Sequence, residues 1–290
     1  MNCRIVSPYE NIPASQFKGN LHTHTTNSDG PLSPQETITA YARRGYDFLM
    51  ISDHDFITNV SAFDNCGMLL MPGNEITDRG MHMSHVNATV KVEPYPERQR
   101  VIDAINGLPD SLCILNHPNW GERFVHSTQE EIEALNGFIG IEIYNGVSLR
   151  VEGSALATER WDMLLSRGRR VWGFGNDDGH IPEDYGIAWN MIFAEECTVP
   201  AIMAALQKGQ FYVSTGVRID VIEIGDTGIH ICSRDTDCFR VYGDHGMMLA
   251  SIEDNELNYD LPARSKPTYL RVECHGRGAR MTWTQPFFLT

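Results

Sequence analysis

Residues 19–24, Gly19-Asn20-Leu21-His22-Thr23-His24, decide how this chain is expected to fold and where its functional residues gather. Side chains on an extended chain alternate between two faces, so His22 and His24 point to the same side. One metal ion can therefore contact both imidazoles. Most of the further candidate ligands also follow short apolar runs: Asp29, His54, Glu75, His85, His117, Asp178 and His180.

Residues 17–213 alternate between apolar runs of strand length and segments with a helical pattern. We expect strands at 48–52, 68–71, 86–92, 112–116, 138–144, 171–174 and 190–194, and helices at 34–44, 97–106, 128–135, 153–167 and 200–208. Ser33-Pro34-Gln35-Glu36 has the form of a capping box at the start of the first helix. This alternation predicts a mostly parallel sheet. Chemistry in a closed β/α barrel gathers at the carboxyl ends of the strands, where every candidate ligand except His85 falls.

The sequence changes character after about residue 214. Short alternating runs at 218–224, 228–232, 238–242, 268–273 and 279–283 are separated by turn-prone pairs such as Gly225-Asp226 and Gly243-Asp244. We therefore predict two parts, an α/β barrel over residues 1–213 and a small all-β appendage over residues 214–290.

Charge and composition limit the classes of partner. The net charge of −15 disfavours binding to long nucleic acid, which requires Lys and Arg to neutralise phosphates. It does not exclude an anionic substrate, because bound divalent metals reverse the local field. No apolar run has the length of a membrane span, and Met1 to Pro8 lacks the apolar core of a signal peptide. The seven cysteines include no C-x-x-C pair and are expected to be reduced thiols, so we expect a cytoplasmic protein.

Several segments, in order along residues 17–213, resemble the motifs of the PHP (polymerase and histidinol phosphatase) family of metal-dependent phosphoesterases. They are Asn20 to His24 with Asp29-Gly30, Ile51 to Asp55, Gly73-Asn74-Glu75, Asn116-His117-Pro118 and Asn176 to His180. The C-terminal part, including Phe211 to Gly216 and Trp283 to Pro286, is similar to the β-rich tail of a bacterial branch of PHP hydrolases. That branch includes enzymes assigned as hydrolases of carbamates or other esters.

The resemblance implies a distorted (β/α)7 PHP barrel that holds two or three divalent metal ions. By motif, the first ion would be held by His22, His24, Glu75 and Asp178, and the second by Glu75, His85 and His117, with Glu75 bridging. Asp29, His54 and His180 would hold a third ion. Mixed imidazole and carboxylate ligands suit Zn, Mn or Fe, and the spacing does not choose between them.

Some assignments within this set leave alternatives open. Asp177 competes with Asp178, and the Asp-x-His spacing favours Asp178. His82 competes with His85, which we prefer because it begins the expected strand at 86–92. Asp53 and Asp55 are expected to orient neighbouring imidazoles or to hold their loop. Candidates for substrate contact are Asn145, Arg123, Arg150 and Arg218, each with the alternative of a turn or surface role.

The chemistry of such a site points to hydrolysis. Two cations depress the pKa of a shared water, and the resulting hydroxide is nucleophilic near neutral pH without a serine or cysteine nucleophile. We therefore predict a metal-dependent hydrolase of a small phosphoester, with His22, His24, Glu75, Asp178 and His180 as catalytic residues. The β-rich tail favours a second hypothesis, a carboxylic ester, carbamate or amide metallohydrolase. A non-catalytic metal-binding module is a third. The substrate and the oligomeric state are not specified by the sequence.

Overall fold

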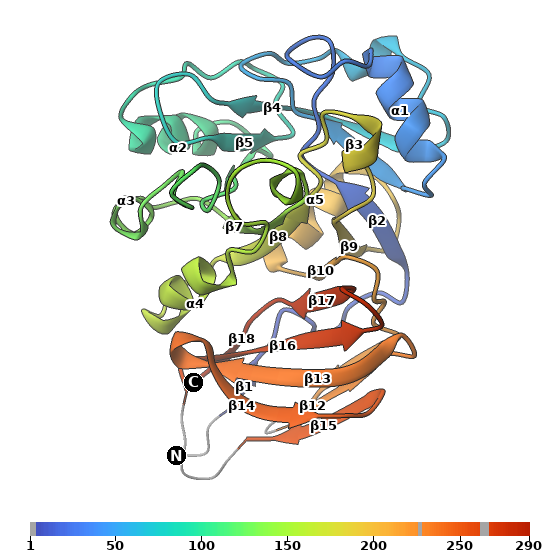
Figure 1. Cartoon of the computed structure of the whole chain (residues 1–290), viewed down its shortest axis with the longest axis vertical. Helices are drawn as coiled ribbons and strands as arrows, with labels where there is room; N and C mark the ends of the chain where they lie inside the picture. The colour runs from blue at the N-terminus through green and yellow to red at the C-terminus, as the bar shows by residue number, and fades with distance from the viewer. Residues whose placement is uncertain (1–3, 226–227, 262–266) are drawn as a thin grey trace.

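Seven strands, β2 to β8, form a ring in the upper part of the molecule (Figure 1). The computed structural model describes residues 4–225, 228–261 and 267–290. An isolated bridge between Thr23 and Gly179 joins the chain beyond β2 to the chain beyond β8 and closes the ring. The strands are β2 (Gln16–Asn20), β3 (Phe48–Ile51), β4 (Leu69–Ile76), β5 (Met83–Val86), β6 (Leu112–Leu115), β7 (Gly140–Asn145) and β8 (Trp172–Asn176). The fold is therefore mixed α/β, as the sequence predicts.

The ring departs from a regular parallel barrel at β5. β2, β3 and β4 run parallel, as do β6, β7 and β8, but β5 pairs antiparallel with both β4 and β6. The sequence-based prediction of a strand at 86–92 is wrong, because β5 already ends at Val86. Asn87 has φ of 59°, a left-handed conformation that interrupts an extended strand.

Helices follow several of the strands on the outside of the ring. They are α1 (Pro34–Ala42), α2 (Arg98–Asn106), α3 (Gln129–Ala134), α4 (Thr158–Ser166) and α5 (Val199–Lys208), with 3-10 turns η1 (Val60–Ala62), η2 (Val147–Leu149), η3 (Pro182–Asp184) and η4 (Asp244–Gly246). The capping box at Ser33 and Glu36 forms as predicted. α4 begins later than expected, because Gly153 and Leu156 are held in bridges to Trp120 and Tyr144.

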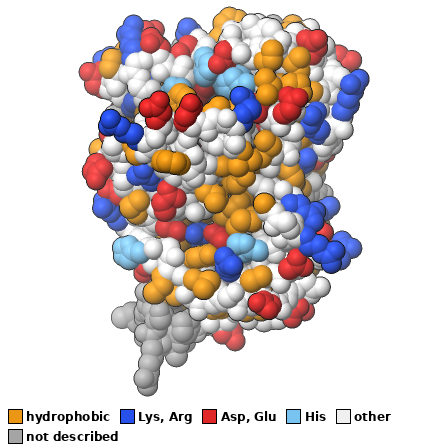
Figure 2. Space-filling model, viewed as in Figure 1, with side chains coloured by type: hydrophobic (Ala, Val, Ile, Leu, Met, Phe, Trp, Pro, Cys, Tyr) orange, Lys and Arg blue, Asp and Glu red, His pale blue; other side chains and the backbone are white. Residues whose placement is uncertain are grey.

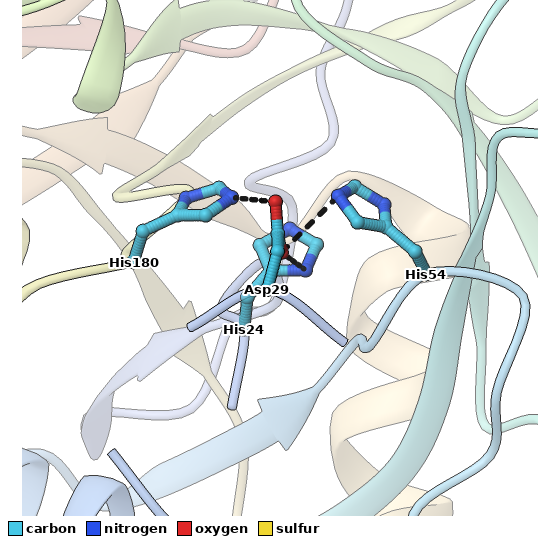
Figure 3. A group of neighbouring side chains, drawn as sticks. All are labelled: His24, Asp29, His54 and His180. Atoms are coloured by element: carbon cyan, nitrogen blue, oxygen red, sulfur yellow. Dashed lines mark ion pairs between the residues drawn. The ribbon is translucent and has the colours of Figure 1, made fainter. Parts of the chain in front are cut away.

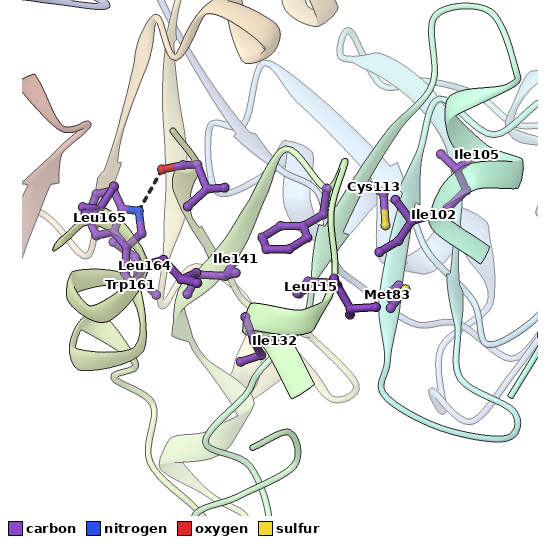
Figure 4. Close-up of a cluster of buried hydrophobic side chains, with 14 of the residues drawn as sticks. Met83, Ile102, Ile105, Cys113, Leu115, Ile132, Ile141, Trp161, Leu164 and Leu165 are labelled. Atoms are coloured by element: carbon purple, nitrogen blue, oxygen red, sulfur yellow. Dashed lines mark hydrogen bonds between the residues drawn. The ribbon is translucent and has the colours of Figure 1, made fainter. Parts of the chain in front are cut away.

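The core between the helices and the ring consists of apolar clusters, of which one packs against α2, α3 and α4. Figure 4 shows Trp161, Leu164 and Leu165 of α4 beside Ile141 of β7, within a cluster that extends to α2 and β6. Trp161 is fully buried, and its Nε1 donates a hydrogen bond to the Val171 carbonyl at 2.9 Å. Helix periodicity therefore directs one face of each helix onto the ring.

The lower part of the molecule is built from antiparallel strands (Figure 1). A path β1-β18-β16-β17-β10-β9 leads into β2, and β13 and β14 join it at β16. β9 (Trp189–Phe193) and β10 (Phe211–Ser214) lie above the lower part, and β9 pairs with β2. The lower strands of this sheet are β1 (Ile5–Val6), β13 (Thr236–Gly243), β14 (Met247–Ile252), β16 (Tyr269–Gly276), β17 (Met281–Thr284) and β18 (Phe287–Leu289). A second sheet contains β11 (Val221–Ile224), β12 (Gly228–Cys232) and β15 (Glu256–Asp260).

The β-rich character predicted after residue 214 is thus present, and β12 has the predicted bounds. Asp226 of the expected Gly225-Asp226 turn and Cys3 lie outside the described residues. The division of the chain at residue 213 stays a prediction. Within the described residues, none of the helices has the length and apolar character that a membrane span requires.

Candidate metal centre

One rim of the ring collects the predicted ligands. His22 and His24 follow β2, His54 follows β3, Glu75 lies near the end of β4, His117 follows β6, and Asp178 and His180 follow β8. All these strands are parallel, so their carboxyl ends open at the same edge. Residues that are far apart in the sequence thereby become neighbours.

Glu75 is the centre of this group and is fully buried. Its Oε1 lies 3.3 Å from His22 Nε2 and 3.0 Å from His117 Nε2, and its Oε2 lies 2.9 Å from His54 Nδ1. His24 Nε2 is 3.6 Å from the same Oε2. One carboxylate therefore faces four imidazoles from three segments of chain, which is the arrangement expected of a bridging ligand.

Asp178 faces the two histidines of the opening motif. Its Oδ1 is 3.2 Å from His22 Nε2 and 3.1 Å from His24 Nε2. Asp177 points elsewhere, because its carboxylate accepts hydrogen bonds from the backbone of Gly186 and Ala188. The structure thus places Asp178, and not Asp177, beside the histidines, as the Asp-x-His spacing favours.

A second group lies at the outer side of the rim. Asp29 Oδ1 is 3.4 Å from His54 Nε2, and Asp29 Oδ2 is 3.3 Å from His180 Nε2. His24 lies behind them, with its Nδ1 3.9 Å from Asp29 Oδ1 (Figure 3). Asp29, His54 and His180 are more exposed than Glu75, whereas His24 is buried. They form one of the groups whose geometry is compatible with an ion.

The preference for His85 over His82 is wrong. His82 Nδ1 lies 3.3 Å from Glu75 Oε1, whereas His85 Nε2 contacts Ser111 Oγ at 3.1 Å. Because β5 is antiparallel, its amino end meets the carboxyl ends of the parallel strands, and His82 directly precedes it. His85 lies three residues further along, about 10 Å toward the opposite edge of the ring. Burial lowers the pKa of His85 to about 4, so its imidazole is neutral.

The buried acids and histidines of the centre shift one another's pKa values in different directions. Burial alone would raise the pKa of Glu75, but His22 and His82 outweigh it and hold that pKa well below its usual value. Burial likewise opposes protonation of His22, and Asp178 and Glu142 reverse its effect and raise the pKa of that imidazole. Burial dominates at His24 and lowers its pKa. Buried carboxylates of this kind need positive charge beside them.

The donor atoms fit metal ions. Among the described residues, His22 Nε2, His24 Nε2, Glu75 Oε2 and Asp178 Oδ1 are buried and have no hydrogen-bond partner. Such orphaned atoms are rare in proteins and call for an explanation. They lie 3.1–3.6 Å from neighbours in the same set, which matches the spacing of ligands around a cation with bonds of about 2.0–2.2 Å. Imidazole nitrogen and carboxylate oxygen are ligands that Zn, Mn and Fe accept.

Glu142 is a buried carboxylate that the sequence analysis missed. Its Oε1 accepts a hydrogen bond from His22 Nδ1 at 2.8 Å, and its Oε2 accepts one from the His117 backbone at 2.9 Å. Histidines that ligate metals are commonly oriented in this way. The available signal was a charged residue between Ile141 and Ile143 in an apolar strand, where an unpaired charge is costly.

The predicted substrate contacts separate into three groups. Arg150 lines a pocket of about 380 Å³ together with Glu75 and His117. Asn145 is buried, and its Nδ2 donates to Asp178 Oδ2 at 3.0 Å, so it supports that carboxylate and does not line the pocket wall. Arg123 is exposed on a neighbouring loop, and Arg218 lines a separate pocket. Figure 2 shows histidine side chains gathered in the upper part of one face, between acidic and basic side chains.

The pocket wall is also formed by residues that lie outside the sequence motifs. Trp120 lines it, with its ring centroid 5.4 Å from that of His117. His126 packs behind, where its Nε2 accepts a hydrogen bond from the His82 backbone at 3.0 Å. Burial, with His117 next, lowers the pKa of His126 to about 3. The loop after β6 therefore gives the pocket an aromatic side.

Comparisons with known proteins agree with this architecture. No family model matches the sequence. Over 78 residues the chain is 36% identical to a 5'-3' exoribonuclease of Haemophilus influenzae, a match that spans 24% of this chain and 28% of that protein.

Two solved structures cover more of the chain. A two-domain protein of Bacteroides vulgatus, described as containing a predicted PHP-like metal-dependent phosphoesterase, aligns over 98% of this chain and 90% of its own with a TM-score of 0.56 and 17% identity. PsfC of Pseudomonas syringae aligns over 67% of this chain and 90% of its own with a TM-score of 0.50 and 12% identity. At such identities the likeness concerns the fold. The chain thus shares the fold of the two-domain protein that contains the predicted PHP-like phosphoesterase.

Proposed function

We propose that this protein is a metal-dependent hydrolase that acts on a small phosphoester and uses two or three divalent ions. The observation that carries the proposal is the set of buried, unpartnered imidazole and carboxylate atoms that meet at Glu75. His22, His24, Glu75 and Asp178 would hold one ion, and Glu75, His82 and His117 a second. Asp29, His54 and His180 would hold a third.

When bound, the ions would lower the pKa of a water and offset negative charge on the substrate. The side chains of this chain then have separable tasks. Glu142 accepts a hydrogen bond from Nδ1 of His22, which fixes the imidazole ring and leaves the His22 Nε2 facing the centre. Asn145 holds Asp178 in place. Trp120, Val147 and Ile181 supply apolar wall to the pocket.

Arg150 favours a phosphoester over a neutral ester. Its Nε and Nη2 donate to the two carboxylate oxygens of Asp184 at 2.9 and 2.8 Å. Asp184 also accepts from the backbone of His180 at 3.1 Å, so the same carboxylate fixes both the arginine and a predicted ligand. A guanidinium held at the pocket wall is suited to a phosphate oxygen. We retain the prediction of a cytoplasmic protein, supported by the free thiols of the described cysteines.

The test is hydrolysis by protein stripped with a chelator and reloaded with Mn, Zn or Fe. We expect metal-dependent turnover of p-nitrophenyl phosphate or bis(p-nitrophenyl) phosphate, or of a short RNA oligonucleotide, in view of the exoribonuclease match. Glu75→Gln should abolish activity and the uptake of the two ions that Glu75 would hold. Turnover of p-nitrophenyl acetate alone would favour the carboxylic ester alternative, and full metal occupancy without any turnover would contradict the proposal.

Arg150→Gln separates the two ester classes. Glutamine retains a donor for Asp184 but removes the positive charge. Loss of a charged hydrogen bond to phosphate should lower kcat/KM for a phosphomonoester about 10- to 100-fold. Turnover of an aryl carboxylic ester, if present, should change little. Equal losses on both substrates would show that Arg150 does not select for phosphate.

A further inference from the structure

A second cluster of metal-ligating side chains lies on the sheet formed by β11, β12 and β15. His230 and Cys232 are two residues apart on β12, so they share a face. The other face of that strand packs into the apolar core through Ile229 and Ile231, which are 2% and 0% exposed. Figure 1 places β12 and β15 at the end of the molecule opposite β3 and β4. The cluster is therefore separate from the centre at Glu75.

Strand register brings acidic and amide side chains beside this pair. Asn258 of β15 is directly opposite His230, and Glu256 is directly opposite Cys232. On the other side, Glu223 of β11 is directly opposite His230. Side chains of residues paired in this way lie on the same face, about 4.5–5.5 Å apart at Cβ. One nitrogen of His230, the sulfur of Cys232 and one oxygen of Glu256 all lie within 4.8 Å of one another.

Hydrogen bonds fix the state of the His230 ring. Asn258 Nδ2 donates to Glu256 Oε1 at 3.1 Å, and because a carboxylate only accepts, this sets the orientation of the amide. The Asn258 Oδ1 then accepts from His230 Nδ1 at 2.9 Å. The proton is thus on Nδ1, and Nε2 presents a lone pair. Imidazoles that bind metals are oriented by an acceptor in the same manner.

The lone pair of Nε2 faces sulfur at a separation suited to a shared ion. His230 Nε2 and Cys232 Sγ are 3.4 Å apart. Tetrahedral zinc, with bonds of about 2.3 Å to sulfur and about 2.0 Å to nitrogen, separates these ligands by about 3.5 Å. The surrounding charges also suit a cation. Glu223 lies directly opposite His230 and Glu256 directly opposite Cys232, and the nearby Arg234 is already paired with Asp220.

We propose that His230, Cys232 and Glu256 form a mononuclear site for a divalent transition metal, with zinc as the best match to a thiolate, imidazole and carboxylate set. Binding forms bonds from the ion to Nε2, Sγ and a Glu256 oxygen, and the proton of the Cys232 thiol is released to solvent. Three protein ligands leave a fourth position for water. The site is independent of the proposed hydrolase centre, whose predicted ligands are all nitrogen and oxygen.

Cobalt distinguishes the two sites, because only a sulfur ligand gives thiolate-to-cobalt charge-transfer absorption in the near ultraviolet. Full-length protein stripped of metal is titrated with Co²⁺ under reducing conditions. We expect the band to appear in the parent protein, to vanish in Cys232→Ser and to persist in Cys238→Ser, a half-buried cysteine on β13 that serves as the matched control. Zinc content by elemental analysis should fall by one equivalent per chain in Cys232→Ser and stay unchanged in Cys238→Ser.

Two further variants identify the other ligands. His230→Ala and Glu256→Gln should each weaken cobalt binding at this site, by about tenfold or more. Circular dichroism verifies that each variant is folded. Absence of the band at excess Co²⁺, or a band that survives in Cys232→Ser, would overturn the proposal. If no band appears, the contact between Cys232 Sγ and His230 Nε2 is a thiol-to-imidazole hydrogen bond without a metal.

Discussion

At the scale of single residues, the centre depends on how each imidazole is held. Glu142 contributes no atom to the pocket lining, yet its two oxygens accept from the His22 ring and from the His117 backbone. Burial would raise the pKa of Glu142, but His22 outweighs it and lowers that pKa. The carboxylate is therefore ionised, and it holds two predicted ligands from inside the ring.

Glu142→Gln should weaken metal binding without unfolding the chain. The amide keeps the shape of the side chain but removes the charge that makes His22 a more basic ligand. Loss of such a partner reduces metal affinity about 10- to 100-fold. The measurement is a competition titration with a chromophoric chelator, with the exposed Glu130→Gln of α3 as control. Equal affinity in Glu142→Gln and the parent protein would assign Glu142 to folding alone.

At the scale of elements, the direction of β5 decides which histidine reaches the centre. A strand that runs parallel to its neighbours would have placed its carboxyl end, and hence His85, at the functional rim. Because β5 is antiparallel, its amino end and His82 lie there instead. His82 also contacts His126 through its backbone, so the loop after β6 supports it.

His82→Ala and His85→Ala test this assignment as a matched pair. His82→Ala removes an imidazole 3.3 Å from Glu75 and should lower occupancy at one ion by tenfold or more, about the effect of removing a metal partner. His85→Ala removes a neutral, buried ring beside Ser111 and should cost stability but retain metal content. Elemental analysis together with thermal unfolding separates the two effects. The reverse pattern would restore His85 as a ligand.

At the scale of the whole molecule, a buried ion pair joins the β-rich part to the helices of the ring. Arg271 of β16 is 2% exposed and donates from Nε and Nη2 to the two oxygens of Asp162 in α4, at 2.7 and 2.8 Å. Tyr269 donates to the same Asp162 at 2.6 Å. Trp283 and Phe288 also belong to the apolar cluster that contains Trp161. The two parts of the chain therefore share a packed surface.

Arg271→Met should destabilise the whole chain. It leaves the Asp162 carboxylate buried without its counter-charge, and breaking a buried pair in this way costs about 3–5 kcal/mol. Urea unfolding monitored by tryptophan fluorescence measures the loss. Arg234→Met serves as the control, because its pair with Asp220 is solvent-exposed and should contribute far less. A change as small as that of the control would mean that packing alone joins the two parts.

The sequence by itself indicated the mixed α/β fold and most of the residues that gather at one rim of the ring. His22, His24, Glu75 and Asp178 could be found from local motifs, because each lies at or just beyond the end of a strand, and parallel strands present their ends at one edge. The capping box at Ser33 could also be predicted, since the start of a helix depends on neighbouring residues in the sequence.

Only the tertiary structure decided the rest. Strand direction is a non-local property, so the choice of His82 over His85 required the pairing of β5 with β4 and β6. Glu142 acquires its role from His22, 120 residues away in sequence. The cluster at His230 and Cys232 likewise depends on register with β15, a strand that the sequence analysis did not predict. Local patterns specify which face a side chain takes, and long-range pairing specifies what it meets there.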